Sequence, residues 1–599
     1  MKRGDVMSAI CGIANFQSEI HIPAFQKSQQ ALKARFTKPT AVLEKKHLAL
    51  ACSEGIESHV YQGKTYTVGF FGRLRNESKL RLELQKTYPE AQHVTLPHLI
   101  LLAYLAYQEA CADHMDGAFI IALCVDQRLI LIRDALGVNS LYYKLDQGTL
   151  YFASELKGLL VHEQQHRVDK TGLWMLLGIL PALVPGQTPY HGFFSLRPGH
   201  YLIYEDQKVK TERWWHMTTQ LNTKPKEMIK QELHQMITES ILADMPEDKT
   251  SCFLSGGLDS SLIAAVCQNH SQQPIVTYSV DYEDQARYFH SYSYQTTRDN
   301  DYIQEMCEQY PFQHRLMTIK QKALIETLET VMKARDLPGM VDIDSSLYLF
   351  SQRISQDTHC ILSGECADEI FGGYPWFYKE TLYTSDYFPW TTQVADRLAL
   401  FKDETTRQEV ERYMQECKQR SLDEINQLDS DPENARKQQM MYLTMEWFMQ
   451  TLLVRGDVLG GLCDLEIRMP FANKAIAEYV WNVPWHILYA NQEEKGLLRE
   501  IFEDILPASV AHRKKNPYPK THSPVYTELA CAKLKSVLAD PHCRLQEIFD
   551  MQAIQQLLDS QGASFKSPWY GQLMTGPQLI SYLYTINQWL NEYHIILDD

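Results

Sequence analysis

One stretch decides the fold of the second half of this chain, Phe253-Leu254-Ser255-Gly256-Gly257-Leu258-Asp259-Ser260-Ser261. An apolar run ends at Leu254, two glycines follow, and a second apolar run begins at Leu262, which predicts a strand, a tight loop and a helix. A helix N-terminus behind a glycine loop presents oriented N–H groups and a positive dipole to an anion. Because glycines admit a phosphate close to the backbone and serines add hydroxyl donors, the stretch predicts a phosphate-binding loop.

The carboxylate of Asp259 inside this loop narrows the chemistry. A carboxylate beside phosphates is explained if it holds a cation that the phosphates also touch. No lysine follows the glycines, so the loop lacks the mononucleotide pattern G-x-x-x-x-G-K-[ST]. It resembles instead the pyrophosphate loop of ATP pyrophosphatases, which cleave ATP between the α and β phosphates. A glycine turn that only caps a helix is the alternative, and it explains the two glycines but not the whole stretch.

A second segment holds three carboxylates within five residues, Ile361-Leu362-Ser363-Gly364-Glu365-Cys366-Ala367-Asp368-Glu369-Ile370-Phe371-Gly372-Gly373-Tyr374. Like charges repel one another and are poorly placed beside Ile370 and Phe371 unless they surround a metal or an electrophilic substrate. A solvated acidic turn is the alternative, and the apolar neighbours disfavour it.

Together the two segments resemble the synthetase domain of the asparagine synthetase family, whose motifs run S-G-G-x-D-S and then S-G-E-x-x-D-E-x-F-G-G-Y. Three further matches follow in the family's order, at 465–471, 494–499 and 513–515. The resemblance covers essentially the whole chain and implies an α/β fold with two domains. Residues 1–216 would form an Ntn-type αββα glutaminase-like sandwich. Residues 226–599 would form an α/β ATP pyrophosphatase domain of the adenine-nucleotide α-hydrolase type, with many helices.

The resemblance implies that ATP and Mg²⁺ bind where the ends of three strands meet. Residues 277–280 predict the next strand, and in an open α/β sheet ligands lie outside the carboxyl ends of the strands. Strands that end near residues 254, 280 and 363 can therefore share one nucleotide. The residues expected to bind ATP are Phe253, Leu254, Ser255, Gly256, Gly257, Asp259, Ser260, Val280, Ser363 and Gly364. Asp259 and Asp368 are the expected metal ligands.

In the implied reaction, a carboxylate of a small-molecule or peptide acceptor attacks the α-phosphorus and gives an acyl-adenylate and pyrophosphate. Ammonia or a substrate amine then displaces AMP. Lys495 is expected to stabilise the developing negative charge, and Glu365 to accept a proton from the attacking nitrogen. Taken alone, Lys495 is most simply interpreted as a solvent-exposed helix lysine. Its position in the segment Glu-Lys-Gly-Leu-Leu-Arg favours the catalytic role. Glu369 and Arg455 are expected to contact the acceptor.

The acceptor pocket departs from the family's pattern. After Arg455 and Asp457, the family's R-K-D-R-M-S-M-A continues here as Val458-Leu459-Gly460-Gly461-Leu462-Cys463. Each glycine weakens a helix by about 1 kcal/mol, and Asn473 replaces the carboxylate of the family's P-F-x-D. Other segments, such as 516–522, look like one bacterial branch of glutamine-hydrolysing asparagine synthetases.

The first half resembles the family's glutaminase domain, with apolar runs of strand length at 119–123, 129–132 and 150–153. In the family an N-terminal cysteine is the nucleophile, and its own α-amino group is the general base. The matching Cys11 lies ten residues inside this chain, where its nitrogen is an amide unless a leader is removed.

Other residues of the glutaminase site are also replaced. The family's Asn-Gly-Glu is replaced by Phe71-Gly72-Arg73, and its Arg-Gly-Pro-Asp has no counterpart in Lys38-Pro39-Thr40-Ala41. Leu96 occupies the position of an expected Asp. Arg73 also reverses the charge that faces the ammonium group of the substrate. We therefore expect a retained fold without glutaminase activity, in which Cys11 is a small buried residue of the first strand.

Composition excludes several classes of partner. A hydrophobic content of 45% and a charged content of 22% are typical of a globular chain with a large core, and a net charge of −16 disfavours a nucleic-acid surface. Thirteen cysteines without C-x-x-C pairs indicate neither a zinc site nor a disulfide framework. Without a signal peptide or a long apolar run, we expect a cytoplasmic protein with no membrane partner. The oligomeric state stays open, a homodimer included.

Three functions are compatible with these features. The first is an ATP-dependent ligase that makes asparagine or a related amide from free ammonia. The second is a biosynthetic enzyme like the β-lactam synthetases and lasso-peptide macrolactam synthetases, in which an amine of the substrate itself attacks, and Met7-Ser8-Ala9-Ile10 resembles the start of many lasso cyclases. The third is a non-catalytic scaffold, which the retained Glu365, Asp368 and Lys495 disfavour.

Overall fold

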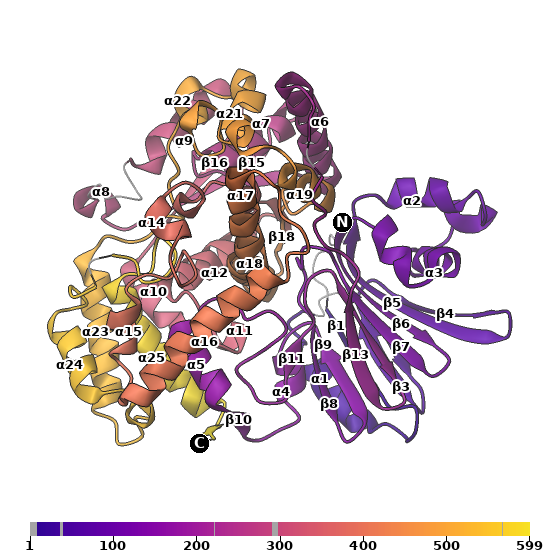
Figure 1. Ribbon diagram of the computed structural model, residues 1–599, viewed down its shortest axis with the longest axis horizontal. Coiled ribbons are helices and arrows are strands. Elements are labelled where there is room, and N and C mark those ends of the chain that lie inside the picture. The colour runs from indigo at the N-terminus through magenta and orange to yellow at the C-terminus, as the bar shows by residue number, and fades with distance from the viewer. Residues whose placement is uncertain (1–8, 36–39, 221, 290–296, 566, 599) are drawn as a thin grey trace. The chain divides into compact units, whose positions relative to one another are not determined.

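The computed structural model describes residues 9–35, 40–220, 222–289, 297–565 and 567–598 (Figure 1). The chain divides into two compact units. Unit 1 comprises Met1–His166, Val184–Met217 and Leu452–Glu466, and unit 2 comprises Arg167–Leu183, Thr218–Thr451 and Ile467–Asp599. Two short segments thus group differently from the expected domains 1–216 and 226–599, so those boundaries stay a prediction. Within the described ranges, no helix has the length and apolar character needed to cross a membrane.

Unit 1 contains two antiparallel six-stranded sheets, in the orders β11-β8-β9-β1-β3-β2 and β13-β12-β7-β6-β5-β4. The strands of the first sheet are β1 (Ile10–Ala14), β2 (Ala41–Glu44), β3 (Leu48–Cys52), β8 (Tyr142–Asp146), β9 (Thr149–Ala153) and β11 (Phe194–Ser195). Those of the second are β4 (Ile56–Tyr61), β5 (Lys64–Leu74), β6 (Gly117–Val125), β7 (Arg128–Arg133), β12 (His200–Glu205) and β13 (Lys208–Arg213). The three apolar runs predicted as strands form β6, β7 and β9.

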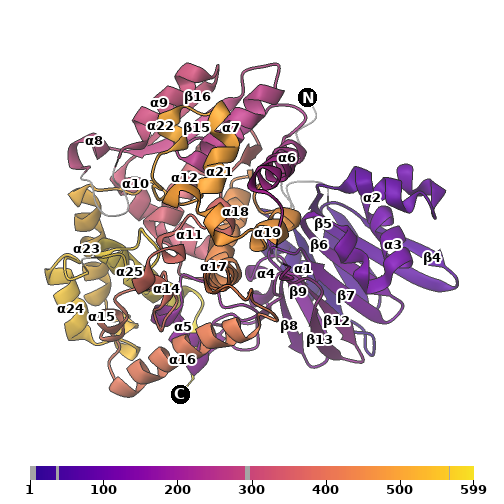
Figure 2. The ribbon, with the colours of Figure 1, turned by 45° about the horizontal axis from the view of Figure 1, so that its top comes forward.

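Helices cover the outer faces of both sheets, which confirms the αββα sandwich. They are α1 (Ile22–Ala31), α2 (Glu77–Leu84), α3 (Leu96–Tyr107) and α4 (Lys157–Leu160), with 3₁₀ turns η1 (Pro89–Gln92) and η2 (Gln108–His114). Helix α1 contacts β1 and β3, whereas α3 contacts β4 and β5. Figure 2 shows α2 and α3 over the second sheet.

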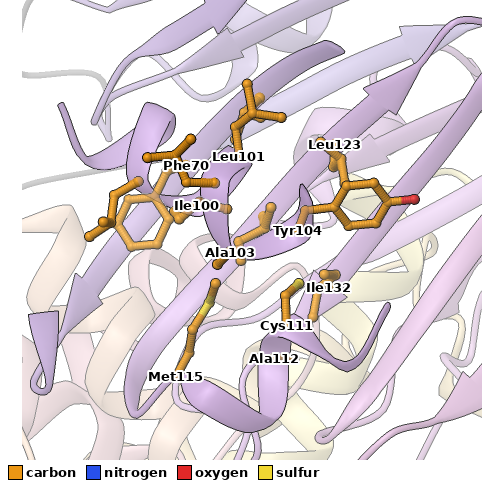
Figure 3. Close-up of a cluster of buried hydrophobic side chains, with 14 of the residues drawn as sticks. Phe70, Ile100, Leu101, Ala103, Tyr104, Cys111, Ala112, Met115, Leu123 and Ile132 are labelled. Atoms are coloured by element: carbon orange, nitrogen blue, oxygen red, sulfur yellow. The ribbon is translucent and has the colours of Figure 1, made fainter. Parts of the chain in front are cut away.

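Strand β6 explains why its sequence is a continuous apolar run. Phe119, Ile121 and Leu123 point toward α3, and the alternate residues Ile120 and Ala122 point toward the other sheet. Side chains of a strand alternate between its faces, so a strand covered on both faces must be apolar throughout. Figure 3 shows the cluster on the α3 side, where residues of α3 and η2 pack against those of the strands.

Unit 2 is built on a five-stranded sheet in the order β16-β15-β14-β17-β18, with parallel pairing at β14–β15, β14–β17 and β15–β16. Its strands are β14 (Ser251–Phe253), β15 (Val276–Tyr282), β16 (Gln313–Ile319), β17 (Cys360–Leu362) and β18 (Glu466–Arg468). Because parallel neighbours end at the same edge, the carboxyl ends of β14, β15 and β17 meet, as predicted. Figure 1 shows α7, α9, α21 and α22 around β15 and β16.

Helices make up most of unit 2. In chain order they are α5 (Lys170–Gly178), α6 (Lys226–Asp244), α7 (Leu258–His270), α8 (Gln285–Tyr288), α9 (Asp299–Gln309), α10 (Gln321–Glu326), α11 (Leu328–Arg335), α12 (Asp342–Ile354), α13 (Ala367–Phe371), α14 (Glu380–Tyr383), α15 (Val394–Leu398), α16 (Glu404–Asp423), α17 (Pro432–Leu443), α19 (Lys474–Trp481), α20 (Trp485–Leu488), α21 (Gly496–Phe502), α22 (Ala508–Ala511), α23 (Pro524–Leu538), α24 (Met551–Asp559) and α25 (Gly576–Glu592). A π-helical turn, η4 (Thr444–Phe448), precedes α18 (Met449–Leu462), and β10 (His166–Val168) pairs with β19 (Ile595–Leu597).

Candidate active site

The phosphate loop predicted from the sequence lies between β14 and α7. β14 ends at Phe253 and α7 begins at Leu258, so strand, loop and helix N-terminus occur in the predicted order. Gly256 has a φ of +66°, and a Cβ there would lie 2.7 Å from the Cβ of Tyr302. Only glycine meets both conditions without strain. The tight turn therefore depends on this glycine.

Hydrogen bonds within the protein fix the conformation of this loop. The N–H of Ser255 donates to Ser260 Oγ at 3.1 Å, and the two hydroxyl oxygens are 2.9 Å apart. The N–H of Gly257 donates to Ser255 Oγ at 3.3 Å, and the N–H of Leu254 donates to the carbonyl of Tyr278 in β15 at 2.8 Å. A loop ordered in advance loses little conformational entropy when an anion binds.

The acidic segment approaches the phosphate loop from β17. A Cβ on Gly364 would lie 2.9 Å from both the Cβ of Asp259 and the backbone nitrogen of Ser260. The close approach of the two backbones thus requires a residue without a side chain. Helix α13 follows this contact and carries Asp368 and Glu369, both buried.

A buried charge cluster joins the two segments. The Nζ of Lys495 donates to Asp259 Oδ1 and Oδ2 at 2.8 and 2.6 Å, and to Asp368 Oδ1 at 2.7 Å. Lys515 forms an ion pair with the other oxygen of Asp368. A Cβ on Gly373 would lie 1.9 Å from Asp368 Oδ1, so this carboxylate fits only beside glycine. Two carboxylates and two ammonium groups therefore balance in charge at the edge of the sheet.

Burial and neighbouring charges act in opposite directions on the pKa values of this cluster. Burial alone would raise the pKa of Asp368, but Lys495 and Lys515 outweigh it and lower that pKa to about 2. Burial would lower the pKa of Lys495, but Asp259 and Asp368 outweigh it and raise that pKa. At neutral pH both groups are charged, as an ion pair in a low-dielectric site requires.

The other two carboxylates of the acidic segment differ in environment. Burial, together with the charge of Asp368, raises the pKa of Glu369 from 4.5 to about 8. Its Oε1 accepts a hydrogen bond from the hydroxyl of Tyr374 at 2.8 Å. Glu365 is only partly buried, and its N–H donates to Ser363 Oγ at 3.3 Å. With a pKa of about 8, the Glu369 carboxyl is mostly protonated at neutral pH. Glu365 is the more exposed of the two carboxylates.

Two other residues expected to bind ATP, Val280 and Phe253, belong to strands of the parallel sheet. Val280 is a buried residue of β15, two positions before the strand ends at Tyr282. The ring of Phe253 lies 5.3 Å from the ring of Phe350 in α12. These positions lie at the predicted edge, and their contacts with a nucleotide stay predictions.

Arg513 supports the phosphate loop, a role that the sequence pattern did not predict. Its guanidinium donates to the carbonyl of Ser255 at 3.1 Å and to Asp299 Oδ1 at 2.6 Å, and it lies 4.1 Å from the ring centroid of Tyr302. The family-like segment 513–515 was the only signal for Arg513 and Lys515. Lys515 and its partner Asp368 are 147 positions apart in the chain. A local sequence pattern cannot predict a contact over such a separation.

The two residues expected to contact the acceptor fall in different units. Arg455 is a buried residue of α18 in unit 1, whereas Glu369 belongs to unit 2, so a common role stays a prediction. Two positions along α18, Asp457 pairs with Arg35 at 2.6 Å. Helix α18 continues through Gly460 to Leu462, because packing can override weak helix propensity.

The glutaminase-like half retains its fold around Cys11. This residue lies within β1, paired with Ala51 on one side and Ala153 on the other, and it is fully buried. Burial, reinforced by Cys52, raises the pKa of the Cys11 thiol far above its ordinary range. A buried neutral thiol in mid-strand agrees with the expected structural role.

The altered glutaminase positions are also part of the fold. Phe71 packs in the core between the two sheets, and Leu96 begins α3. Arg73 lies 3.9 Å from a carboxylate oxygen of Glu466, so its charge has a partner within unit 1. Lys38, Pro39, Met7 and Ser8 lie outside the described residues. All thirteen cysteines are within them and are free thiols.

Comparison with known proteins agrees with this architecture. The Asparagine synthase family profile matches residues 230–591, and a Glutamine amidotransferase domain profile matches residues 7–215. Asparagine synthetase [glutamine-hydrolyzing] 3 of Bacillus subtilis (strain 168) is 37% identical over 550 residues, which cover 90% of this chain and 89% of that protein. Asparagine synthetase B [glutamine-hydrolyzing] of Escherichia coli (strain K12) is 25% identical over 81% of this chain and 75% of its own length.

An αββα amidotransferase-like unit and a parallel-sheet synthase unit with a glycine-rich, charged edge define an enzyme of the ATP-dependent amide ligase kind. The chain belongs to the asparagine synthase family, which its sequence already resembled.

The charge cluster predicts how stability depends on Lys495. Lys495→Met removes the cation between two buried carboxylates, so the free energy of unfolding should fall by about 3–5 kcal/mol. Chemical denaturation of the full chain measures this change. Lys514→Met, at an exposed lysine of the same segment, should change it by less than about 0.5 kcal/mol. Equal stability of the two variants would contradict the proposed balance of charge.

The raised pKa of Glu369 predicts a dependence of stability on pH. The folded pKa of about 8 lies above the ordinary 4.5, so the folded state binds more protons and loses stability as pH rises through this window. Glu369→Gln should remove that loss, and its stability relative to wild type should increase from about pH 5 to about pH 8. Denaturation at both pH values tests this, with Glu380→Gln, at an exposed glutamate, as the control. Parallel curves for wild type and Glu369→Gln would show that Glu369 is charged throughout.

Proposed function

We propose that this enzyme activates a carboxylate with ATP and joins it to ammonia or an amine, most simply converting aspartate to asparagine. The observation that carries the proposal is the convergence of Asp259, Asp368, Lys495 and Lys515 at the end of a pre-ordered glycine loop. N–H donors at a helix N-terminus bind phosphates, and carboxylates hold the Mg²⁺ that accompanies them. The similarity to asparagine synthetases over most of the chain supports the same reaction.

The loop would bind the phosphates of ATP through its backbone. The N-terminus of α7, which begins at Leu258, would present its first-turn N–H groups to an anion, and the neighbouring hydroxyls of Ser255 and Ser260 would add donors. Arg513 keeps the carbonyl of Ser255 engaged, so that this carbonyl does not face the phosphates.

The donor set at this edge fits Mg²⁺. The carboxylates of Asp259 and Asp368 both contact the Lys495 ammonium at 2.6–2.8 Å, so they lie close enough together to contribute to one metal site. Mg²⁺ binds through one or two carboxylates with phosphate oxygens and water completing its shell, so no third protein ligand is needed. The bound ion would neutralise charge on the pyrophosphate.

Lys495 and Lys515 would then act on the phosphates. In the reaction an acceptor carboxylate oxygen bonds to the α-phosphorus, and the bond to the β-phosphate oxygen breaks, releasing pyrophosphate. Both ammonium groups lie within the cluster, where they stabilise negative charge as it builds on these oxygens. A nitrogen then bonds to the acyl carbon, AMP leaves, and Glu365, the partly exposed carboxylate, takes the proton.

The nitrogen would come from free ammonia or an amine and not from glutamine. In this chain the nitrogen of Cys11 is a peptide amide within β1, which cannot accept a proton. The thiol is buried, and Arg73 and Phe71 occupy positions at which the family binds glutamine. The relatives are named for glutamine hydrolysis, so this half is where the chain would differ from them.

The products distinguish this chemistry from simple ATP hydrolysis. With Mg²⁺, aspartate and ammonia, we expect AMP and pyrophosphate in amounts equal to the amide, resolved by chromatography. Asp259→Asn should abolish their formation because the phosphates would lose metal-borne neutralisation, whereas the exposed Asp301→Asn should not. Release of ADP and phosphate as primary products would refute the proposal. If products form with another amino-carboxylate substrate and not with aspartate, that substrate is the acceptor.

The altered glutaminase half predicts independence from Cys11. Glutamine should release no glutamate above background, and Cys11→Ala should leave ammonia-dependent synthesis within about twofold of wild type, since the residue only packs in β1. Cys52→Ala, at a buried neighbour, controls for lost packing. Glutamine-dependent synthesis that Cys11→Ala abolishes and Cys52→Ala preserves would show an active nucleophile.

A further inference from the structure

Three metal-binding side chains meet in unit 1, on elements that the proposed reaction does not use. Glu57 and His59 are two positions apart in β4, so they project from the same face of the strand. His98 lies in the first turn of α3. One ligand atom of each lies within 4.8 Å of the others, and among the described residues no other group of three His, Cys, Asp or Glu side chains does so.

The contacts between these side chains already hold the ligand atoms together. His59 Nε2 lies 2.8 Å from Glu57 Oε2, and the rings of His59 and His98 lie 4.0 Å apart at 33°. The other oxygen of Glu57 accepts a hydrogen bond from the hydroxyl of Thr95. The same hydroxyl accepts the N–H of His98 at 3.4 Å and caps α3. Thr95 therefore orients both the carboxylate and the helix turn that carries the second histidine, as outer-sphere partners of a metal do.

A second histidine–glutamate pair in the same unit shows what an ordinary ion pair looks like. His114 Nδ1 lies 2.9 Å from Glu83 Oε1. The side chains of His114 and Glu83 are 32% and 35% exposed, similar to the 31% and 29% of His59 and Glu57. The ring of His114, however, stacks on Tyr107 at 3.7 Å and not on another imidazole. An ion pair needs one histidine, so the second imidazole beside Glu57 requires a different explanation.

We propose that Glu57, His59 and His98 bind one divalent transition-metal ion of the zinc type, which joins edge strand β4 to helix α3. Two imidazoles and one carboxylate are ligands that Zn²⁺ and Co²⁺ accept, whereas Mg²⁺ and Ca²⁺ prefer oxygen alone. Three protein ligands leave a fourth position for water.

The proposed ion would act on a defined part of the fold. Among the described strands β4 is the last of its sheet and pairs with β5 alone, and an edge strand leaves a row of backbone N–H and C=O groups unpaired. Helix α3 is anchored to the same sheet by the apolar cluster seen in Figure 3, formed by residues such as Ile100 and Leu101. A metal at the start of α3 would strengthen the contact between α3 and β4, a strand in which no residue is fully buried.

Metal binding to the full chain tests the proposal. Protein stripped with chelator is dialysed against Zn²⁺ in excess Mg²⁺, which saturates the carboxylates of the nucleotide site. We expect about one Zn²⁺ per chain and a higher melting temperature with Zn²⁺. His59→Gln and His98→Gln should each weaken binding by more than about tenfold, because loss of even an outer-sphere partner costs that much. His114→Gln, in the matched ion pair, should bind like wild type.

Co²⁺ identifies the ligands if the histidine variants fold poorly. Bound Co²⁺ should give visible d–d bands without the near-ultraviolet charge-transfer band of a thiolate. Glu57→Gln can keep the hydrogen bonds to Thr95 and His59, but the d–d bands of bound Co²⁺ should disappear in this variant. Stoichiometric binding that survives all three substitutions would overturn the proposal. A thiolate band, or Zn²⁺ uptake by wild type no greater than by His59→Gln, would do so as well.

Discussion

The ammonium group of Lys495 between the carboxylates of Asp259 and Asp368 is the interaction on which the synthase unit depends. Each of the three charges would be costly to bury alone, and together with Lys515 they reach neutrality. Their positions come from three separate segments, each at or near the end of a strand or the start of a helix. The site is therefore also a junction that fixes how these segments pack.

Glycines make this junction sterically feasible. Gly364 and Gly373 stand where a Cβ would collide with Asp259 or Asp368, and a Cβ on Gly496 would lie 2.1 Å from the carbonyl of Ala490. Lys495 itself has a φ of 54°, in the left-handed region, immediately before α21. Uncommon backbone conformations of this kind persist where the surrounding structure compels them, and they cluster at functional sites. The chemistry thus rests on backbone geometry as much as on the charged residues.

The fold of the amidotransferase-like unit does not depend on a reactive cysteine. The alternation of β6 and the packing of Phe71 and Cys11 maintain both sheets, and none of these contacts needs a reactive cysteine. Arg73 replaces a carboxylate and finds Glu466 within its own unit. Because the core and the site draw on different side chains of the same strands, one can change while the other is retained.

The sequence by itself determined the local units: the strand, loop and helix around residues 253–261, the strand-length apolar runs, and the family to which the chain belongs. Periodicity and glycine placement act over a few residues, so they can be recognised in a linear chain. Only the tertiary structure decided that Lys495 bridges two carboxylates, that Lys515 and Arg513 join the site, and that His98 lies beside Glu57 and His59. These contacts link residues that are far apart in the chain, and the raised pKa of Glu369 depends on burial. Neither distance in space nor burial has a local pattern in the sequence.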